Sequence, residues 1–355
     1  MYRRRAALFT LLLMAGLAAI LGVAVWREVR QTQLNQALIT AVRHRDAPTV
    51  VTLLKGGADA NARESDAIRL SLWSLLRNRL AGKTTPTSHA ATALAIACGY
   101  SVEAEANSPQ QLAIVAALLA KGADVNGKDP DGDPVIILPI RWENASCVQM
   151  LLNAGADPNA ADAKGTPALL AAVGGYNPCV SQKLPNGQTI VEMWIGHRVL
   201  DAAQWKAEYI ILKDLLNRGA KIEASCYGGG TALHWVSKDD YVEAVRLLVA
   251  RGTNVNARDD DGDTPLIEAG GCGSSGTVRF LLAHGADMEA RNNNGQTALL
   301  ETAEYGYPEI IEMLLTHGAN PAAKDNKGRG VLKIVRQGFD DTATYRLLKH
   351  AGARE

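Results

Sequence analysis

Apolar residues recur along the chain in pairs of short helical segments separated by polar turns. In residues 259–291, the turn DDDGD is followed by TPLIEA, which favours the start of a first helix. The glycine-rich stretch at residues 270–276 then predicts a flexible link. After it, Val278, Phe280 and Leu281 supply the buried side of a second helix, which ends at HGAD. The segment therefore predicts one helix–turn–helix unit.

This unit repeats at a fixed interval. Its second helix ends in a Gly-Ala pair, or once in Gly-Thr, and the intervals between these glycines are 65, 33, 64, 33, 33, 33 and 34 residues. The two long intervals are close to twice 33, so each predicts a unit that carries an insertion. The spacing predicts eight units over residues 34–355, stacked as a solenoid because one helix pair cannot bury its own apolar side. The glycines are Gly57, Gly122, Gly155, Gly219, Gly252, Gly285, Gly318 and Gly352.

The motifs resemble the ankyrin repeat family. That family's helix start, Thr-Pro-Leu-His-x-Ala, is matched by TPLIEA at residues 264–269, TALHWV at residues 231–236 and TALAIA at residues 92–97. Its tail is matched by LLNAGADPNA at residues 151–160. The resemblance extends over most of the chain. It implies an all-α ankyrin-repeat solenoid that binds another protein, but it does not imply which protein is bound. We expect no catalysis and no cofactor, because the motifs inspected below show no constellation for either.

The N-terminal segment differs from the repeats. Residues 6–26 carry no charge and follow three arginines, and 21 residues at about 1.5 Å each span the roughly 30 Å of a bilayer core. They predict a single-pass membrane helix, preceded by a short tail (residues 1–5) and followed by a stalk (residues 27–33). Cleavage of a signal peptide after Ala24 is the alternative. The arginines favour a bacterial inner membrane with periplasmic repeats, and cleavage would leave them periplasmic or secreted.

Two insertions are expected in the repeat domain of residues 34–355, near residues 65–91 and 174–208. In the first, residues 68–80 predict an amphipathic helix. In the second, a turn sequence, LPNG, precedes residues 191–216, which are predicted to be mostly helical. We expect the stacked units to tolerate both, since an inserted loop whose ends lie close together costs little stability.

Composition narrows the classes of partner and site. The 37 basic and 37 acidic residues balance, which argues against the basic surface of a nucleic-acid-binding protein. The five cysteines show no CxxC spacing, which argues against a zinc site or a disulfide scaffold. In an oxidising compartment one or two cysteine pairs could still bridge, and the sequence does not say which.

No candidate for catalysis or metal binding survives inspection of its spacing. The acidic runs at residues 129–133 and 259–263 resemble calcium loops, but the twelfth position of each is Ile140 or Gly270 instead of the required glutamate. They are interpreted as turns and helix caps. His234 stands where the resemblance implies a histidine that hydrogen-bonds within and between repeats. The stretch GGCGSSG lacks the lysine of a phosphate loop and the pattern Gly-x-Ser-x-Gly.

What remains is a binding surface. The resemblance implies that loop tips and the ends of the first helices line a concave face. Trp142 beside Arg141 is the sharpest pair, although a possible extra residue in that repeat lets the two exchange places, and Trp142 could instead pack on the adjacent insertion. The candidate protein-binding residues are Arg141, Trp142, Tyr227, Lys238, Asp239, Asp261, Asp263, Asn294, Glu304 and Tyr305.

The sequence thus predicts a non-enzymatic protein-binding chain on the far side of a bacterial inner membrane. One specific hypothesis is an immunity or inhibitor protein that binds a toxic effector. The alternative is a scaffold or chaperone that supports an envelope enzyme, for example in stress defence. An enzyme with its site in the insertions is disfavoured, because His89 and His197 are isolated and few acids converge there.

Overall fold

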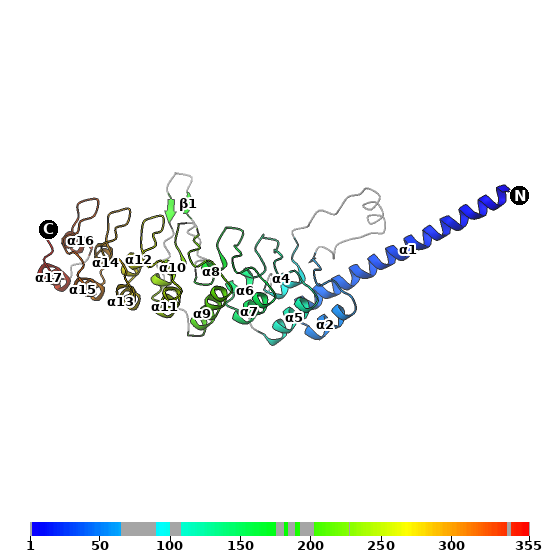
Figure 1. The fold of residues 1–355 in the computed structure, drawn as a ribbon, viewed down its shortest axis with the longest axis horizontal. Helices are drawn as coiled ribbons and strands as arrows, with labels where there is room; N and C mark the ends of the chain where they lie inside the picture. Colours follow the sequence, from blue (N-terminus) through cyan, green and yellow to red (C-terminus); the bar gives the residue numbers. More distant parts are fainter. Residues whose placement is uncertain are drawn as a thin grey trace. The chain divides into compact units, whose positions relative to one another are not determined.

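The fold consists of helix pairs joined by loops, seen in a computed structural model (Figure 1). Two compact units divide the chain, Met1–Ala156 and Asp157–Glu355, here called the first and the second unit. The structure describes residues 2–64, 90–99, 108–174, 181–183, 189–191, 202–226, 228–338 and 342–354.

The described residues of the first unit form three helix pairs. The end of α1 packs against α2 and α4, and α5 packs against α2, α4 and α7, which in turn contacts α6. The apolar sides meet in a continuous core in which Leu38, Leu94 and Leu118 are fully buried. The helices are α1 (Tyr2–Arg43), α2 (Ala47–Lys55), α4 (Ala93–Ala97), α5 (Pro109–Ala120), α6 (Ile137–Arg141) and α7 (Ala145–Asn153).

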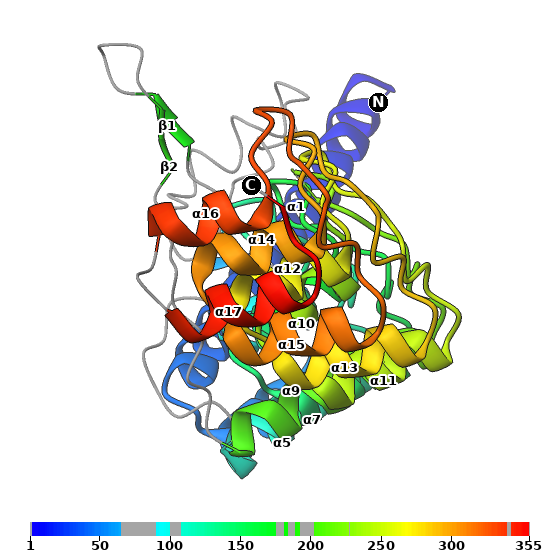
Figure 2. The same ribbon diagram turned by 90° about the vertical axis from the view of Figure 1, so that its left-hand side faces the viewer.

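The second unit stacks its helices in two rows, which Figure 2 shows nearly end-on. First helices contact first helices, in the order α8, α10, α12, α14 and α16, and second helices contact second helices from α9 to α17. The first helices are α8 (Ala168–Ala171), α10 (Ala232–Lys238), α12 (Pro265–Cys272), α14 (Ala298–Tyr305) and α16 (Val331–Gly338). The second helices are α9 (Ala202–Asn217), α11 (Val242–Ala250), α13 (Ser275–Ala283), α15 (Pro308–Thr316) and α17 (Thr342–His350).

A threonine cap fixes where several first helices begin. The Thr92, Thr264 and Thr297 hydroxyls each accept a hydrogen bond from the backbone N–H three residues on, at Ala95, Ile267 and Leu300. Such a side chain satisfies one of the backbone donors that the first helical turn leaves unpaired. The Thr-x-Leu motif therefore acts as a helix start, as the sequence predicted.

The acidic runs form turns. Asp259 Oδ1 accepts the backbone N–H groups of Asp261 and Asp263 at 3.0 and 2.8 Å. Asp129 Oδ1 does the same for Asp131 and Asp133, both at 2.9 Å. A side chain that holds the backbone in this way is a structural turn element, so the turn interpretation of both runs is confirmed.

An asparagine links several repeats to the repeat that follows and shows what the insertions change. Asn126 Nδ2 donates to the Gly155 carbonyl, 29 residues on, at 3.2 Å. Asn61 makes the same 3.2 Å bond to Gly122, 61 residues on, and Asn159 makes it to Gly219, 60 residues on. Both insertions therefore leave the contact between successive repeats intact, as expected. The total number of repeats stays a prediction.

The glycine-rich link was placed wrongly. Gly270 and Gly271 belong to α12, and only Gly273 and Ser274 separate it from α13. A Cβ atom at Gly270 would lie 2.5 Å from the Thr302 hydroxyl, which itself donates to Ala298. Glycine is present there because α12 and α14 approach each other closely, and the composition alone suggested flexibility.

The second insertion departs from the all-α expectation. Strands β1 (Ser181–Lys183) and β2 (Thr189–Val191) pair antiparallel on either side of the predicted turn, in register from Ser181↔Val191 to Lys183↔Thr189. Residues 189–191, TIV, favour a strand because β-branched side chains fit an extended backbone. The stretch predicted as mostly helical from residue 191 thus begins as a strand, and the helix α9 starts at Ala202.

Several N-terminal and insertion predictions are not confirmed. Residues 2–43 form the single helix α1, so the predicted span and stalk are continuous with the first repeat. Among the helices of the described residues, none is long and apolar enough to cross a membrane, so the predicted span finds no support here. The predicted helix at residues 68–80 and the candidate Tyr227 lie outside the described residues.

Candidate functional site

The exposed side of α10, α12 and α14 carries a regular array of polar side chains, here called the first-helix face. Residues 33 positions apart occupy equivalent places on successive helices. Trp235, Glu268 and Glu301 form one column of this face. The next two columns are Lys238, Gly271 and Glu304, and then Asp239, Cys272 and Tyr305.

Between α10 and α12 the face is neutralised by an ion pair. Lys238 Nζ lies 2.8 Å from Glu268 Oε1 and 5.3 Å from the centre of the Trp235 ring. Burial raises the pKa of Glu268, and Lys238 opposes that rise. Burial alone would lower the pKa of Lys238, but Glu268 reverses the direction. Each charge is therefore stabilised by the other.

Between α12 and α14 the corresponding acid has no such partner. The Oε2 atom of Glu301 is buried and makes no hydrogen bond within the described part of the chain. Burial, followed by the negative charges of Asp263, Glu304 and Glu268, raises the pKa of Glu301 to about 7. Arg329 lowers it only in part. Glu301 is thus half protonated near neutral pH.

The end of α14 contacts the turn before α16 through a network of polar side chains. Glu304 Oε2 accepts a hydrogen bond from Gln296 at 2.7 Å and lies 3.4 Å from Arg329. Arg329 also pairs with Asp325 at 2.6 Å. Tyr305, one position after Glu304, remains 42% exposed. This part of the face therefore combines two acids and one base with an accessible aromatic ring.

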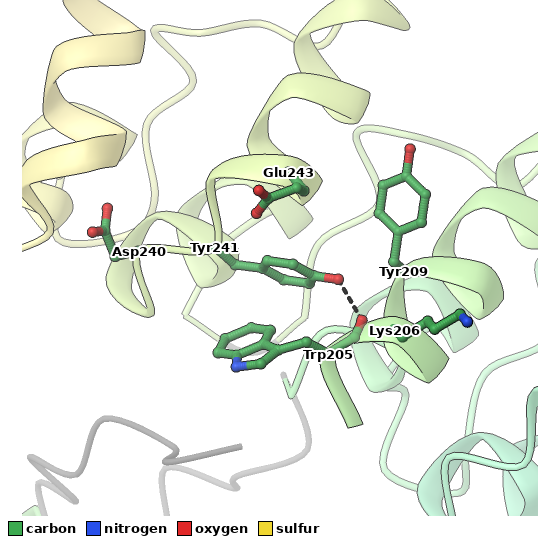
Figure 3. Close-up of a pocket in the computed structure, with 6 residues that line it drawn as sticks. All are labelled: Trp205, Lys206, Tyr209, Asp240, Tyr241 and Glu243. Atoms are coloured by element: carbon green, nitrogen blue, oxygen red, sulfur yellow. Dashed lines mark hydrogen bonds between the residues drawn. The ribbon is translucent and has the colours of Figure 1, made fainter. Parts of the chain in front are cut away.

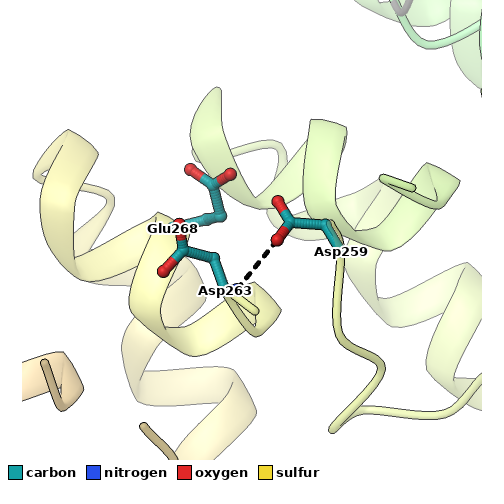
Figure 4. Close-up of side chains that lie close together, drawn as sticks. All are labelled: Asp259, Asp263 and Glu268. Carbon is teal, nitrogen blue, oxygen red and sulfur yellow. Dashed lines mark hydrogen bonds between the residues drawn. The ribbon is translucent and has the colours of Figure 1, made fainter. Parts of the chain in front are cut away.

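Three acids converge beside the turn before α12. Figure 4 shows Asp259, Asp263 and Glu268, whose nearest carboxylate oxygens lie within 4.8 Å of one another. Burial raises the pKa of Asp263 to about 6. All three are engaged: Asp259 holds the turn, Asp263 accepts from Asn292 at 2.8 Å, and Glu268 pairs with Lys238. The group is explained by the turn and the ion pair.

His234 behaves as the resemblance implied. Its Nδ1 accepts the Thr231 backbone N–H at 3.2 Å, and its Nε2 lies 3.1 Å from the Asp263 carbonyl in the next repeat. Burial lowers the pKa of His234, which favours the neutral ring that these bonds require. His234 therefore joins two successive repeats, as the resemblance implied.

Arg141 and Trp142 lie at the end of α6 in the first unit. Arg141 Nη1 pairs with Asp133 Oδ2 at 2.6 Å, eight residues earlier, the same separation as in the Gln296–Glu304 bond. Arg141 is therefore equivalent to Glu304, and Trp142 to Tyr305, which settles the open register. Trp142 is 55% exposed, and its indole lies against Gly99, where an added Cβ atom would come within 3.0 Å.

The remaining candidates lie at the loop tips and at the end of α10. Asp261 and Asn294 are exposed at successive tips, Asp263 is half-buried, and Asp239 is the C-cap of α10. The structure thus brings Lys238, Asp263, Glu304 and Tyr305 around the first-helix face of the second unit. Sequence reasoning missed Glu268 and Glu301, although the 33-residue spacing that links them to Trp235 could have identified both.

A separate pocket of roughly 480 Å³ lies beside the second helices of the second unit (Figure 3). The first two turns of α9 contribute Trp205, whose ring centre lies 4.1 Å from that of Tyr241. The Tyr241 hydroxyl donates to the Trp205 carbonyl. This packing joins the end of the second insertion to the next repeat. The lining residues are Trp205, Lys206, Tyr209, Asp240, Tyr241 and Glu243.

Two of the described cysteines, Cys98 and Cys272, have thiols whose pKa is raised. Cys98 and Cys147 are buried and free, with their sulfur atoms 3.8 Å apart. The Cys147 thiol and burial both raise the pKa of Cys98, and burial raises that of Cys272 to about 11. High pKa values keep these thiols protonated and unreactive at neutral pH, consistent with their interpretation as small apolar residues.

Comparison with known families agrees with this architecture. The family model described as "Ankyrin repeats (3 copies)" matches residues 199–292, 233–325 and 277–352, and the model "Ankyrin repeat" matches residues 131–163. Together the matches cover more than half of the chain. The chain belongs to the ankyrin repeat family. Ankyrin repeats indicate a protein–protein interaction module, and proteins built from them are generally not enzymes.

The curated relatives match only one part of this ankyrin-repeat protein. It is 39% identical over 74 residues to protein phosphatase 1 regulatory subunit 12A of Rattus norvegicus, and 38% identical over 74 residues to the Mus musculus protein of that name. Each match covers 20% of this chain and 7% of the relative. The likeness therefore concerns the repeats and not the whole regulatory subunit.

Proposed function

We propose that this ankyrin-repeat protein acts without catalysis, by binding another protein through the ends of its first helices. The observation that carries the proposal is the exposure of two aromatic residues. Outside α1, the exposed large apolar side chains of the described residues are Val51, Trp142 and Tyr305. Trp142 and Tyr305 stand at the same position of their repeats. Exposed aromatic rings are typical anchors of protein interfaces, and a recurring position favours a shared role.

The test is crosslinked capture of partners by the full-length chain in its native cells. Trp142→Ala and Tyr305→Ala are each expected to weaken recovery of the dominant partner by about ten-fold, since anchor residues often contribute about 1–2 kcal/mol or more. Val51→Ala is the matched control, because Val51 is an exposed apolar residue on the second helix α2. Equal recovery with all three variants contradicts the proposal.

A further variant separates the repeats from the insertion. Shortening the part of the insertion that precedes α9, residues 175–201, is expected to leave the captured partner unchanged. Loss of the partner in this variant alone, with Trp142→Ala and Tyr305→Ala unaffected, would move the binding site to the insertion and make the repeats its support.

The proposed place of action is the periplasmic side of a bacterial inner membrane, and the proposed role is immunity to a toxic effector. The uncharged stretch of residues 6–26 after three arginines supports the proposed location. The immunity role is proposed because the sequence offers no catalytic constellation and its two insertions could extend a binding surface. Protease added to spheroplasts is expected to digest the repeats. In intact inside-out inner-membrane vesicles, whose lumen corresponds to the periplasm, the repeats are expected to be protected. The mass of the mature N-terminus distinguishes an anchor from cleavage after Ala24.

The immunity role predicts that deletion of the gene is toxic only where the effector is made. Survival of the deletion strain under attack by effector-bearing sister cells contradicts it. If deletion instead removes the activity of an envelope enzyme, the scaffold alternative replaces the immunity role.

A further inference from the structure

A step of the first-helix face is the contact between one first helix and the next. The steps from α10 to α12 and from α12 to α14 each carry a glutamate, but only the first carries a base opposite it. Glu268 on α12 and Glu301 on α14 are 33 residues apart and occupy equivalent places. Thirty residues before Glu268 stands Lys238, which pairs with it at 2.8 Å. Thirty residues before Glu301 stands Gly271, which has no side chain to offer. The second step therefore lacks the cation that the first step has.

The glycine supplies no cation to Glu301, whose own side chain lies against it. A Cβ atom at Gly271 would lie 3.2 Å from Cγ and 3.7 Å from Oε1 of Glu301, and 3.7 Å from Cε2 of Tyr305. A side chain entering there from outside would therefore meet the Glu301 carboxylate and the edge of an exposed tyrosine ring. Gly271 is helical without a positive φ, so the backbone does not require glycine at this position.

The unpaired acid is costly to the protein alone. Glu301 Oε2 is buried without a hydrogen bond among the described residues, and a buried charge without a partner is strongly unfavourable. The bases nearest to it are already used, since Lys238 pairs with Glu268 and Arg329 pairs with Asp325 and Glu304. The surrounding acids outnumber these bases. A positive charge supplied from outside would satisfy both the carboxylate and its surroundings.

We propose that Glu301, beside Gly271, pairs with the positive end of one arginine or lysine side chain of the protein partner. This inference rests on the proposed binding role of the first-helix face. Lys238 shows within the same molecule that a long cationic side chain fits such a step. Tyr305 lies beside the same position, with its ring atom Cε2 3.7 Å from the place of a Cβ atom at Gly271, so its ring can pack against the stem of the incoming side chain.

Binding of this kind depends on pH in a defined direction. Glu301 must be ionised to pair with the cation, so affinity rises with pH up to about 7 and then levels, as the pKa of about 7 requires. The groups that set this value are Asp263 and Glu268 from the preceding turn and helix, Glu304 on α14 itself, and Arg329 from the following turn. Cys272 and Tyr305 lie near Gly271 and stay neutral, because burial raises the pKa of the Cys272 thiol and of the Tyr305 hydroxyl.

The experiment selects peptides from a random twelve-residue library displayed on phage, with the full-length chain as target. Enriched peptides are then measured against three variants. Glu301→Gln removes the charge and keeps the shape, Gly271→Lys supplies the cation from within, and Tyr305→Ala removes the exposed ring. Glu309→Gln is the matched control, because Glu309 is an exposed acid on the second helix α15.

The expected result is a family of peptides with a shared arginine or lysine, whose affinity falls about ten-fold or more with Glu301→Gln and with Gly271→Lys. The control leaves it unchanged. Replacing the shared basic residue by norleucine gives the same loss. Peptides that lose affinity with Tyr305→Ala but need no basic residue overturn this inference and leave the proposed function standing. Selected peptides that bind every variant equally, or a library that yields no binder, count against both.

Discussion

The pair of helices α10 and α12 and the pair α12 and α14 each place a glutamate at the same position, but differ in the residue that stands opposite it. In the first, Lys238 neutralises Glu268 at 2.8 Å. In the second, Gly271 stands in the place of the lysine, and Glu301 keeps a buried oxygen without a hydrogen bond among the described residues. Because repeats hold equivalent positions in equivalent places, a single missing side chain marks where the protein's own contacts end and a partner's can begin.

The largest effect is expected from breaking the balanced step. Lys238→Met leaves Glu268 buried without its cation, and we expect a loss of about 2–3 kcal/mol in the free energy of unfolding at neutral pH. Urea unfolding measures it. The loss should shrink as the pH falls and Glu268 becomes protonated, since the cost belongs to the charged form. The double variant Lys238→Met/Glu268→Gln should recover most of the stability, and a loss that is independent of pH would contradict the ion-pair account.

The two neighbouring glycines of α12 should respond in opposite directions. Gly270→Ala places a Cβ atom 2.5 Å from the buried Thr302 hydroxyl, so overpacking should cost about 1–3 kcal/mol. Gly271→Ala meets only the flexible side chain of Glu301, at 3.2 Å, and should gain up to about 1 kcal/mol from helix propensity. Thermal unfolding of both variants checks this, and equal effects would show that the Glu301 side chain does not yield to a Cβ atom at Gly271.

The unpaired acid should make wild-type stability depend on pH. The pKa of Glu301 is about 7 in the folded chain against an ordinary value of 4.5, so its contribution favours folding at low pH and is lost as the pH rises through 4.5 to 7. Glu301→Gln should remove this loss and stabilise the chain by about 1–2 kcal/mol at pH 8, and by much less at pH 4. Urea titrations at the two pH values measure the difference. A uniform effect of the substitution would argue that Glu301 is not buried as a charge.

The smallest expected effect sharpens the comparison most. Gly271→Lys should stabilise the chain by about 0.5–1 kcal/mol more than Gly271→Gln, because both gain helix propensity but only lysine pairs with Glu301. The two variants are compared by urea unfolding at low salt. Identical stabilities would mean that the second step does not accept a cation where the first one does.

The sequence predicted the spacing of the repeats well, because glycine, threonine and aspartate form turns and helix caps through contacts that are local in sequence. Thr264 caps a helix and Asp259 closes a turn with contacts a few residues away, so spacing alone located them. The misplaced link at Gly270 had a distant cause, the approach of Thr302 from the next helix. The strands β1 and β2 formed in an insertion that lies outside the repeat pattern, where only local propensity was available.

The candidate site was predicted only in part, for the same reason. The ends of the first helices were identified from repeat position, and Trp142 and Tyr305 are exposed there. Glu268 and Glu301 lie one turn earlier, among residues that looked like core. Their importance comes from what stands opposite each of them on the preceding helix, Lys238 in one case and Gly271 in the other. That difference is visible only when successive repeats are compared column by column.

The most direct measurement is the pKa of Glu301 by carboxyl carbon NMR on glutamate-labelled full-length protein, with Glu301→Gln to assign the signal. The account predicts a pKa near 7 in the free protein. It predicts a fall toward the ordinary value of 4.5 in Gly271→Lys and in the wild type saturated with a selected arginine- or lysine-containing peptide. A pKa near 4.5 in the free protein, or one that neither the internal nor the external cation lowers, would contradict it.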